Sequence, residues 1–137
     1  MKVFLDTNVL VAAFATRGLC ADVLRTVLAE HELPLSSTVI EELARALIEK
    51  LRVPEPTVGE TTAYLRTSAA ALAEKPSKPA PVPIRDPDDA VILSEALSMG
   101  ADVLVTGDKD LLEADTVPEI MVIDPRGFWR LVREGRS

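Results

Sequence analysis

Short apolar runs that end near acidic residues mark the chain at two distant places. Val3-Phe4-Leu5 stops at Asp6, and Val103-Leu104-Val105 is followed, after a Thr-Gly pair, by Asp108. Unbroken apolar runs of this length are typical of strands buried on both faces of a parallel sheet. Two further strands are predicted at 33–35 and 120–123. The first of these is short or lies at an edge, because its proline donates no hydrogen bond.

The segments between these runs repeat their apolar residues every three or four positions, which predicts helices. Five helices are predicted, at 19–30, 57–73, 87–99 and 128–133 and over a segment that starts between 36 and 38 and ends at about 51. In chain order, that segment is the second helix. The third opens on the capping-box sequence Thr57-Val58-Gly59-Glu60, and the fourth has Asp86 at its cap and Gly100 past its end. Thr7-Asn8 predicts a turn after the first strand. Strands alternating with helices predict a parallel α/β sheet with helices on both sides.

A length of 137 residues, 47% of them hydrophobic, suits a single domain covering 1–137. Residues 74–83 are rich in proline and predict an extended surface connector, since neither half is large enough to fold comfortably alone. The single cysteine, Cys20, excludes an internal disulfide. No apolar run approaches the roughly 18 residues of a membrane span, and no leader sequence is recognisable, so we expect a cytoplasmic protein.

The charge balance limits the kinds of chemistry that the chain can perform. A net charge of −7 argues against a protein that holds nucleic acid by a bulk positive field, so a polyanionic substrate would need a bound cation. The only histidine, His31, lies in the charged sequence Glu30-His31-Glu32. A Ser-His-Asp triad and a zinc site built from His and Cys are therefore disfavoured.

Four acids fall where an α/β sheet places its ligands. Asp6 and Asp108 follow strands, whereas Glu42 and Asp89 lie in the first turns of predicted helices. The carboxyl ends of strands and the amino ends of the following helices share one edge of such a sheet. Carboxylates that converge there repel one another unless a hard cation neutralises them. Oxygen ligands of this kind suit Mg²⁺ or Mn²⁺, which can activate water at a phosphodiester.

Each acid also has a purely structural interpretation. Asp86 and Asp88 complement a helix dipole, and Asp89 could equally be the carboxylate of a capping box. Glu41 completes the capping-box sequence 38–41, which leaves its neighbour Glu42 as the candidate for chemistry. Asp110 could cap the short turn at 111–112.

Three stretches together carry a family resemblance: 3–10 (VFLDTNVL), 86–93 (DPDDAVIL) and 105–112 (VTGDKDLL). In this order and at this length they resemble the PIN-domain family, and more closely the VapC-like toxin components of bacterial and archaeal toxin-antitoxin systems. The resemblance spans residues 3–124. It implies a three-layer α/β/α sandwich around a central, mostly parallel sheet of four or five short strands.

The resemblance also implies a metal-dependent ribonuclease that uses Mg²⁺ or Mn²⁺. Matched motif by motif, the catalytic and metal-binding acids are Asp6, Glu42, Asp89 and Asp108. The accessory residues are Asp110 and Asp86, together with Asn8 and Thr106, which match polar positions that orient ligands or water. Such toxins associate as homodimers and are silenced by a small protein antitoxin, so the resemblance implies RNA, an antitoxin and a second copy as partners.

Lys109, Arg85 and Arg17 lie near the predicted edge and are candidates for contact with substrate phosphates. The main alternative is a catalytically degenerate PIN-fold module that binds RNA or an antitoxin, although the presence of all four acids argues against it. A receiver domain wants paired acids after the first strand, and an aspartyl phosphatase needs an Asp-x-Asp start. The sequence Asp6-Thr7-Asn8 fits neither of these.

Overall fold

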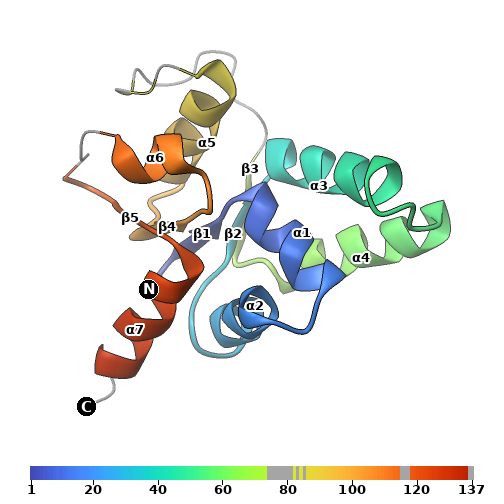
Figure 1. Ribbon diagram of the computed structural model, residues 1–137, viewed down its shortest axis with the longest axis horizontal. Coiled ribbons are helices and arrows are strands. Elements are labelled where there is room, and N and C mark those ends of the chain that lie inside the picture. The colour runs from blue at the N-terminus through green and yellow to red at the C-terminus, as the bar shows by residue number, and fades with distance from the viewer. Residues whose placement is uncertain (74–81, 83, 85, 115–117, 136–137) are drawn as a thin grey trace.

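Parallel strands form the centre of the fold in the computed structural model, which describes residues 1–73, 82, 84, 86–114 and 118–135 (Figure 1). The strands are β1 (Val3–Leu5), β2 (Pro34–Ser36), β3 (Ala71–Ala73), β4 (Val103–Val105) and β5 (Met121–Ile123). One sheet has the order β1-β4-β5 and the other is the pair β2-β3, and every pairing is parallel. The predicted parallel α/β class is confirmed.

Backbone hydrogen bonds at Glu32 join the two sheets side by side. The Val3 amide donates to the Glu32 carbonyl at 2.9 Å, and the Glu32 amide donates to the Met1 carbonyl at 2.9 Å. The strands therefore follow the spatial order β3-β2-β1-β4-β5. The chain winds in one direction from β1 to β3 and resumes on the other side of β1 with β4. In open parallel sheets, ligands bind at such a reversal, outside the carboxyl ends of the strands.

Helices cover both sides of the strands, with α5 and α6 on one side and α2 and α7 on the other (Figure 1). Their bounds are α1 (Thr7–Ala15), α2 (Leu19–Glu30), α3 (Ser37–Glu49), α4 (Glu55–Ser68), α5 (Pro87–Ser98), α6 (Lys109–Glu113) and α7 (Pro125–Gly135). Among them, α1 packs on α2 and α3, and α3 packs on α4. No single helix among the described residues is both long and apolar enough to cross a membrane, and only α1 and α2 taken together, bent by 108°, meet that test.

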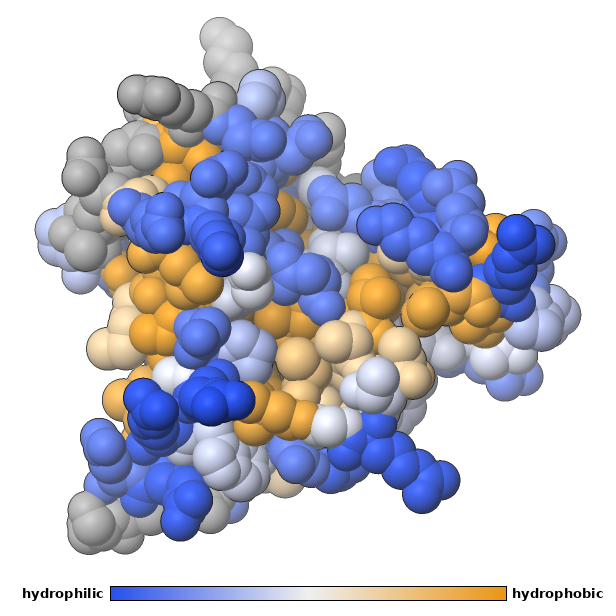
Figure 2. All heavy atoms as spheres, viewed as in Figure 1, coloured by the Kyte–Doolittle hydropathy of each residue, from blue (hydrophilic) through white to orange (hydrophobic). Residues whose placement is uncertain are grey.

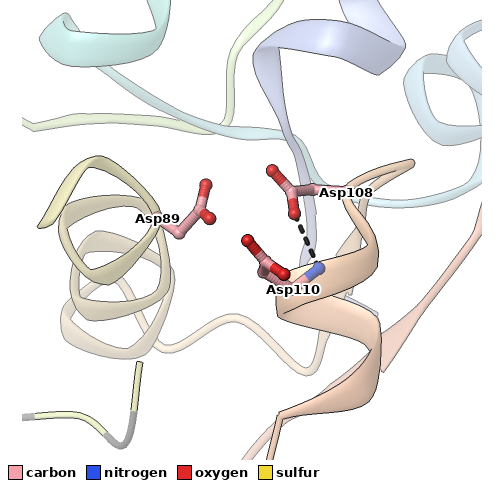
Figure 3. A group of neighbouring side chains, drawn as sticks. All are labelled: Asp89, Asp108 and Asp110. Atoms are coloured by element: carbon pink, nitrogen blue, oxygen red, sulfur yellow. Dashed lines mark hydrogen bonds between the residues drawn. The ribbon is translucent and has the colours of Figure 1, made fainter. Parts of the chain in front are cut away.

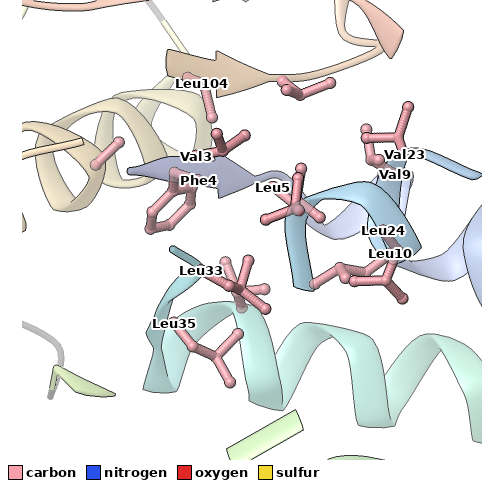
Figure 4. Packing of buried hydrophobic residues seen from close by; sticks show 14 of the residues in the cluster. Val3, Phe4, Leu5, Val9, Leu10, Val23, Leu24, Leu33, Leu35 and Leu104 are labelled. Carbon is pink, nitrogen blue, oxygen red and sulfur yellow. The ribbon is translucent and has the colours of Figure 1, made fainter. Parts of the chain in front are cut away.

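The core lies between the strands and these helices. Phe4 and Leu5 of β1 pack with Leu33 and Leu35, while Leu104 of β4 contacts the same cluster (Figure 4). All three residues of β1 and all three of β4 are buried, because helices cover both faces of the sheet. Each such side chain contributes about 1.5–3 kcal/mol through its removal from water.

Several predicted elements match the structure closely. The helix predicted at 19–30 is α2, the strands at 103–105 and 120–123 are β4 and β5, and α3 falls within its predicted range. Gly100 follows α5 with a φ of 73°, the left-handed conformation that glycine adopts without strain. The predicted connector at 74–83 lies outside the described residues, except for Val82.

Other predictions were wrong. Thr7-Asn8 does not form a turn but opens α1, with Asp6 as its N-cap. The helix was missed because its apolar residues, from Val9 to Ala13, are continuous and show no period. The helix predicted at 57–73 begins earlier, at Glu55, so Thr57 lies inside it and does not cap it. Its predicted end at 71–73 is instead β3, whose backbone pairs with β2.

Because β4 lies in the middle of the sheet, truncating its buried Leu104 side chain should lower the stability of the fold strongly. Leu104→Ala is expected to lower the free energy of unfolding by about 2–5 kcal/mol, because it leaves a cavity between two covered faces of the sheet. Urea denaturation followed by circular dichroism measures this loss. Leu72→Ala on β3 makes the same chemical change at a side chain that is 59% exposed, and it should cost far less. Equal losses in the two variants would contradict the assigned core.

Candidate metal centre

A cleft of about 390 Å³ opens at the carboxyl ends of β1 and β4. Acids from four segments line it: Asp6, Glu42, Asp88, Asp89 and Asp108. The other lining residues are Thr7, Asn8, Val11, Ala12, Ala46, Lys50 and Ile92. In Figure 2, hydrophilic residues gather on the two sides of this hollow, over α5 and α6 on one side and over α3 on the other. The cleft therefore lies at the reversal in strand order.

Asp6 is held rigidly at the base of the cleft. Its Oδ1 accepts a hydrogen bond from the Thr7 amide at 2.7 Å. Its Oδ2 accepts from the Thr106 hydroxyl at 2.7 Å and from Asn8 Nδ2 at 3.3 Å. Burial raises the pKa of Asp6, the hydrogen bonds oppose that rise, and the nearby charge of Asp108 adds to it.

Thr106 and Asn8 also contact the chain that follows β4. The Asp108 amide donates to Thr106 Oγ1 at 3.0 Å, and the Gly107 amide donates to Asn8 Oδ1 at 3.1 Å. Thr106 is fully buried, so its hydroxyl has a fixed surrounding. These two side chains therefore orient Asp6 and the Gly107–Asp108 backbone relative to each other.

Asp89, Asp108 and Asp110 form the tightest acidic group among the described residues, with ligand atoms within 4.8 Å of one another. Figure 3 shows Asp89 pointing from α5 toward Asp108 and Asp110, which lie at the start of α6. Asp108 caps α6 by accepting from the Asp110 amide at 2.8 Å, so the predicted capping role of Asp110 was wrong. Asp6 and Glu42 line the same cleft but lie outside this group of three.

The charge of this group strongly affects Asp89. Burial, together with the nearby charges of Asp108, Asp86 and Asp6, raises the pKa of Asp89 to about 7. Carboxylates this close cannot all ionise without mutual repulsion. A bound cation would remove that repulsion.

Glu42 faces Asp6 from the other side of the cleft. Its Oε2 accepts from the Thr7 hydroxyl at 2.9 Å, whereas Glu41 is exposed and does not line the cleft. Burial raises the pKa of Glu42, and the charge of Asp6 adds to the rise. The capping box predicted at 38–41 was wrong, because Ser36 caps α3 through a 3.2 Å bond from the Val39 amide.

Of the three predicted phosphate contacts, the two that the structure describes do not line the cleft. Lys109 and Arg17 are exposed and absent from its lining, and Arg85 lies outside the described residues. Lys50, at the end of α3, is the one basic side chain that lines the cleft among the described residues. The position of Lys50 could have been inferred from its spacing in the sequence. Glu42, Ala46 and Lys50 follow one another at intervals of four residues and so share a helix face.

Asp86 and Asp88 differ in their roles. Asp86 is exposed and caps α5, with its Oδ1 accepting from the Asp88 amide at 2.8 Å and from the Asp89 amide at 3.4 Å. The predicted cap is therefore confirmed. Asp88 lines the cleft, although its sequence position also suits a helix dipole.

Comparison with known proteins places this arrangement in a family. The model of the PIN domain matches residues 2–110. This chain belongs to the PIN-domain family. The match confirms the resemblance carried by the three short sequence motifs. It also spans Asp6, Glu42, Asp89, Asp108 and Asp110.

Solved structures share the fold of this PIN domain at low sequence identity. A chain from the crystal structure of VapBC2 from Rickettsia felis, bound to a promoter DNA fragment, is 17% identical and has a TM-score of 0.61. That alignment covers 90% of this chain and 98% of that chain. A chain from VapBC-1 of nontypeable Haemophilus influenzae is 18% identical with a TM-score of 0.62, covering 92% of this chain and 99% of that one. A comparison with curated proteins finds no match.

The side chains of this PIN domain fit a hard divalent cation. The ligand atoms offered by Asp89, Asp108 and Asp110 are all carboxylate oxygens, and neither His nor Cys lines the cleft. Mg²⁺ and Mn²⁺ prefer such oxygen ligands. Burial first, and then the neighbouring carboxylates, raise the pKa of Asp89, so a cation bound beside it would favour its ionised form.

The pKa of Asp89 predicts how stability varies with pH. Folded Asp89 keeps its proton up to about pH 7, whereas an unfolded aspartate loses it near pH 3.8. The native state therefore binds more protons in that window, and the metal-free protein should lose stability as pH rises through it. Thermal melts between pH 5 and 8 should show a falling Tm, and Asp89→Asn should flatten the slope and melt higher at pH 8.

Asp22→Asn on α2 is the matched control for this measurement, because Asp22 pairs with Arg25 away from the cleft. The Tm of this variant should fall with pH as steeply as that of the parent. A parent Tm that does not change from pH 5 to 8 would contradict the repulsion assigned to Asp89.

Proposed function

We propose that this PIN domain is a metal-dependent endoribonuclease whose active site is the acidic cleft. One observation carries the proposal: carboxylates from four separate segments line one cleft at the reversal in strand order, and two of them, Asp89 and Asp108, form with the neighbouring Asp110 a group whose ligand atoms lie within 4.8 Å of one another. Such an arrangement costs stability unless a cation occupies it. The net charge of −7 supports the same conclusion, since RNA would approach this chain unfavourably without that cation.

The acids divide into two groups by their contacts. Asp89 and Asp108, with Asp110, would hold Mg²⁺ or Mn²⁺, and Asp6 at the base of the cleft and Glu42 on α3 would complete the ligand set. A cation bound there would lower the pKa of a bound water and stabilise negative charge at the scissile phosphodiester. Thr106 and Asn8 would keep Asp6 in one orientation through their hydrogen bonds to its Oδ2. Asp86 would act indirectly by capping the helix that carries Asp89.

Basic residues would position the RNA backbone. Lys50 lines the cleft from α3 and is suited to bind a phosphate next to the scissile one. Lys109 follows Asp108 directly and would contact phosphates outside the cleft, and Arg17 and Arg85 are further candidates there. These contacts would add to affinity without reading the base sequence.

We further propose that the chain is the toxin of a cytoplasmic toxin-antitoxin pair, acting as a homodimer that a small protein antitoxin silences. The shared fold with chains from two VapBC complexes supports this assignment. The alternative is a degenerate PIN module that binds RNA or antitoxin without cutting. The convergence of Asp6, Glu42, Asp89 and Asp108 on one cleft favours the nuclease.

Cleavage of a fluorogenic RNA panel tests the nuclease directly. The parent should cut RNA with Mn²⁺ or Mg²⁺ and lose activity with a chelator. Asp6→Asn and Asp89→Asn should each lower kcat at least about 100-fold, because each removes a ligand charge while keeping the side-chain shape. Asp22→Asn should cut like the parent.

Two outcomes would reject this function. Full activity in Asp6→Asn would show that the cleft is not the active site. Absence of cutting with either metal, together with no metal-induced rise in Tm, would show that the acids form no metal site and would favour the degenerate module.

The position of Lys50 in the cleft predicts that this side chain contributes to RNA binding and not to the chemical step. Lys50→Ala should raise KM for RNA about five- to tenfold and change kcat little, because it removes a phosphate contact made in both the bound and the transition state. Steady-state kinetics at low ionic strength measure the two constants. Lys2→Ala, on an exposed side chain just before β1 and so at the end of the sheet away from the cleft, is the matched control and should leave KM near the parent value. An unchanged KM in Lys50→Ala would exclude the contact.

A further inference from the structure

A carboxylate lies buried between two helices beside the cleft. Glu95 on α5 is 1% exposed and accepts a hydrogen bond from the Thr38 hydroxyl on α3 at 2.7 Å. Thr38 is also buried, and the other carboxylate oxygen of Glu95, Oε1, has no hydrogen-bond partner. Burying a polar group with so few partners is unfavourable. Neither the family motifs nor the acidic cleft accounts for this pair.

The helix faces that carry this pair also carry the cleft. On α3 the face continues from Thr38 through Glu42, Ala46 and Lys50 at intervals of four residues, and the last three line the cleft. On α5 it runs from Glu95 back through Ile92 to Asp88, at intervals of three and four, and both of these line the cleft. Residues at this spacing share one helix face. The Thr38–Glu95 hydrogen bond therefore joins the two helices where their cleft-lining faces meet.

The main packing partners of these two helices lie elsewhere in the fold. Among the described elements, α3 packs mainly against α1 and α4, whereas α5 packs mainly against α6. The acids of the cleft are divided between them, with Glu42 on α3 and Asp89 on α5. A change in the spacing of α3 and α5 would therefore move Glu42 relative to Asp89.

We propose that the Thr38–Glu95 hydrogen bond sets the opening of the cleft, so that Thr38 and Glu95 are positioning residues for Glu42 and Asp89. The inference rests on the proposed function, in that these acids bind a cation together. Residues that support ligands from outside the ligand set commonly change metal affinity 10- to 100-fold when mutated. Glu95 also adds its charge to the potential at Glu42, where it contributes to the raised pKa of that carboxyl.

The first arm of the test measures helix spacing without metal or RNA. Spin labels at Glu49 on α3 and Ser98 on α5, both exposed, report this spacing by pulsed electron resonance in a Cys20→Ser background. Thr38→Val removes only the hydroxyl donor and should shift or broaden the distance distribution. Thr38→Ser keeps the donor, and Glu95→Gln keeps an acceptor, so both should resemble the parent. Thr67→Val on α4, where the hydroxyl donates within its own helix, should have no effect.

The second arm measures Mn²⁺ affinity by calorimetry on unlabelled protein. Thr38→Val should weaken Mn²⁺ binding about tenfold and Thr38→Ser should restore it. Val27→Ala on α2 removes buried methyl groups away from the cleft, so it lowers stability and should leave the affinity unchanged. This control separates positioning from a general loss of stability.

The outcomes are distinguishable. The inference would be overturned if Thr38→Val had the same distance distribution as the parent. It would also be overturned if the spacing changed and the Mn²⁺ affinity did not, or if Val27→Ala lost as much affinity as Thr38→Val. A parent that binds no Mn²⁺ would reject the proposed function. The spacing arm would then decide alone whether the pair sets the opening of the cleft.

Discussion

Pairing between β1 and β4 brings together the two chain segments, at Asp6 and at Thr106, from which the acidic cleft is built. Leu5 pairs with Val105, so the residues that follow, Asp6 and Thr106, emerge next to each other at the carboxyl end of the sheet. The Asp6 amide then donates to the Val105 carbonyl at 3.0 Å, and the Thr106 hydroxyl donates to the Asp6 carboxylate. A slip of one residue would turn alternate side chains to the opposite face and separate them. The buried apolar residues of both strands therefore fix the register that the site requires.

The ionised carboxylates at this edge of the sheet are destabilised by burial and by one another. Burial raises the pKa values of Asp6 and Glu42, and burial with neighbouring charge raises that of Asp89. Each of these shifts means that the ionised carboxylate is less stable in the fold than in water. A fold that keeps such carboxylates together has a lower stability than one with neutral side chains there, and this is a frequent feature of functional sites.

Sequence reasoning located the acids because their positions relative to strands and helix starts are local signals. Asp6 directly follows an apolar run, and Asp86-Pro87 marks a helix start, so both positions could be read without a structure. Helix α1 and strand β3 were missed because α1 has no apolar period and β3 depends on a backbone partner at 34–36. The close approach of Asp110 to Asp89 and the position of Lys50 in the cleft depend on how helices pack. The Thr38–Glu95 bond joins residues 57 positions apart, and no local pattern indicates it.

The separation of β1 from β4 along the chain has a consequence for synthesis on the ribosome. Asp6 and Thr106 lie 100 positions apart, and Asp89 and Asp108 also come from the second half of the chain. Closing a loop of that length costs conformational entropy before the contacts that reward it can form. A nascent chain that ends before β4 carries Asp6 and Glu42 but no complete cleft. The acidic cleft can therefore assemble only after β4 and Asp108 have been synthesised.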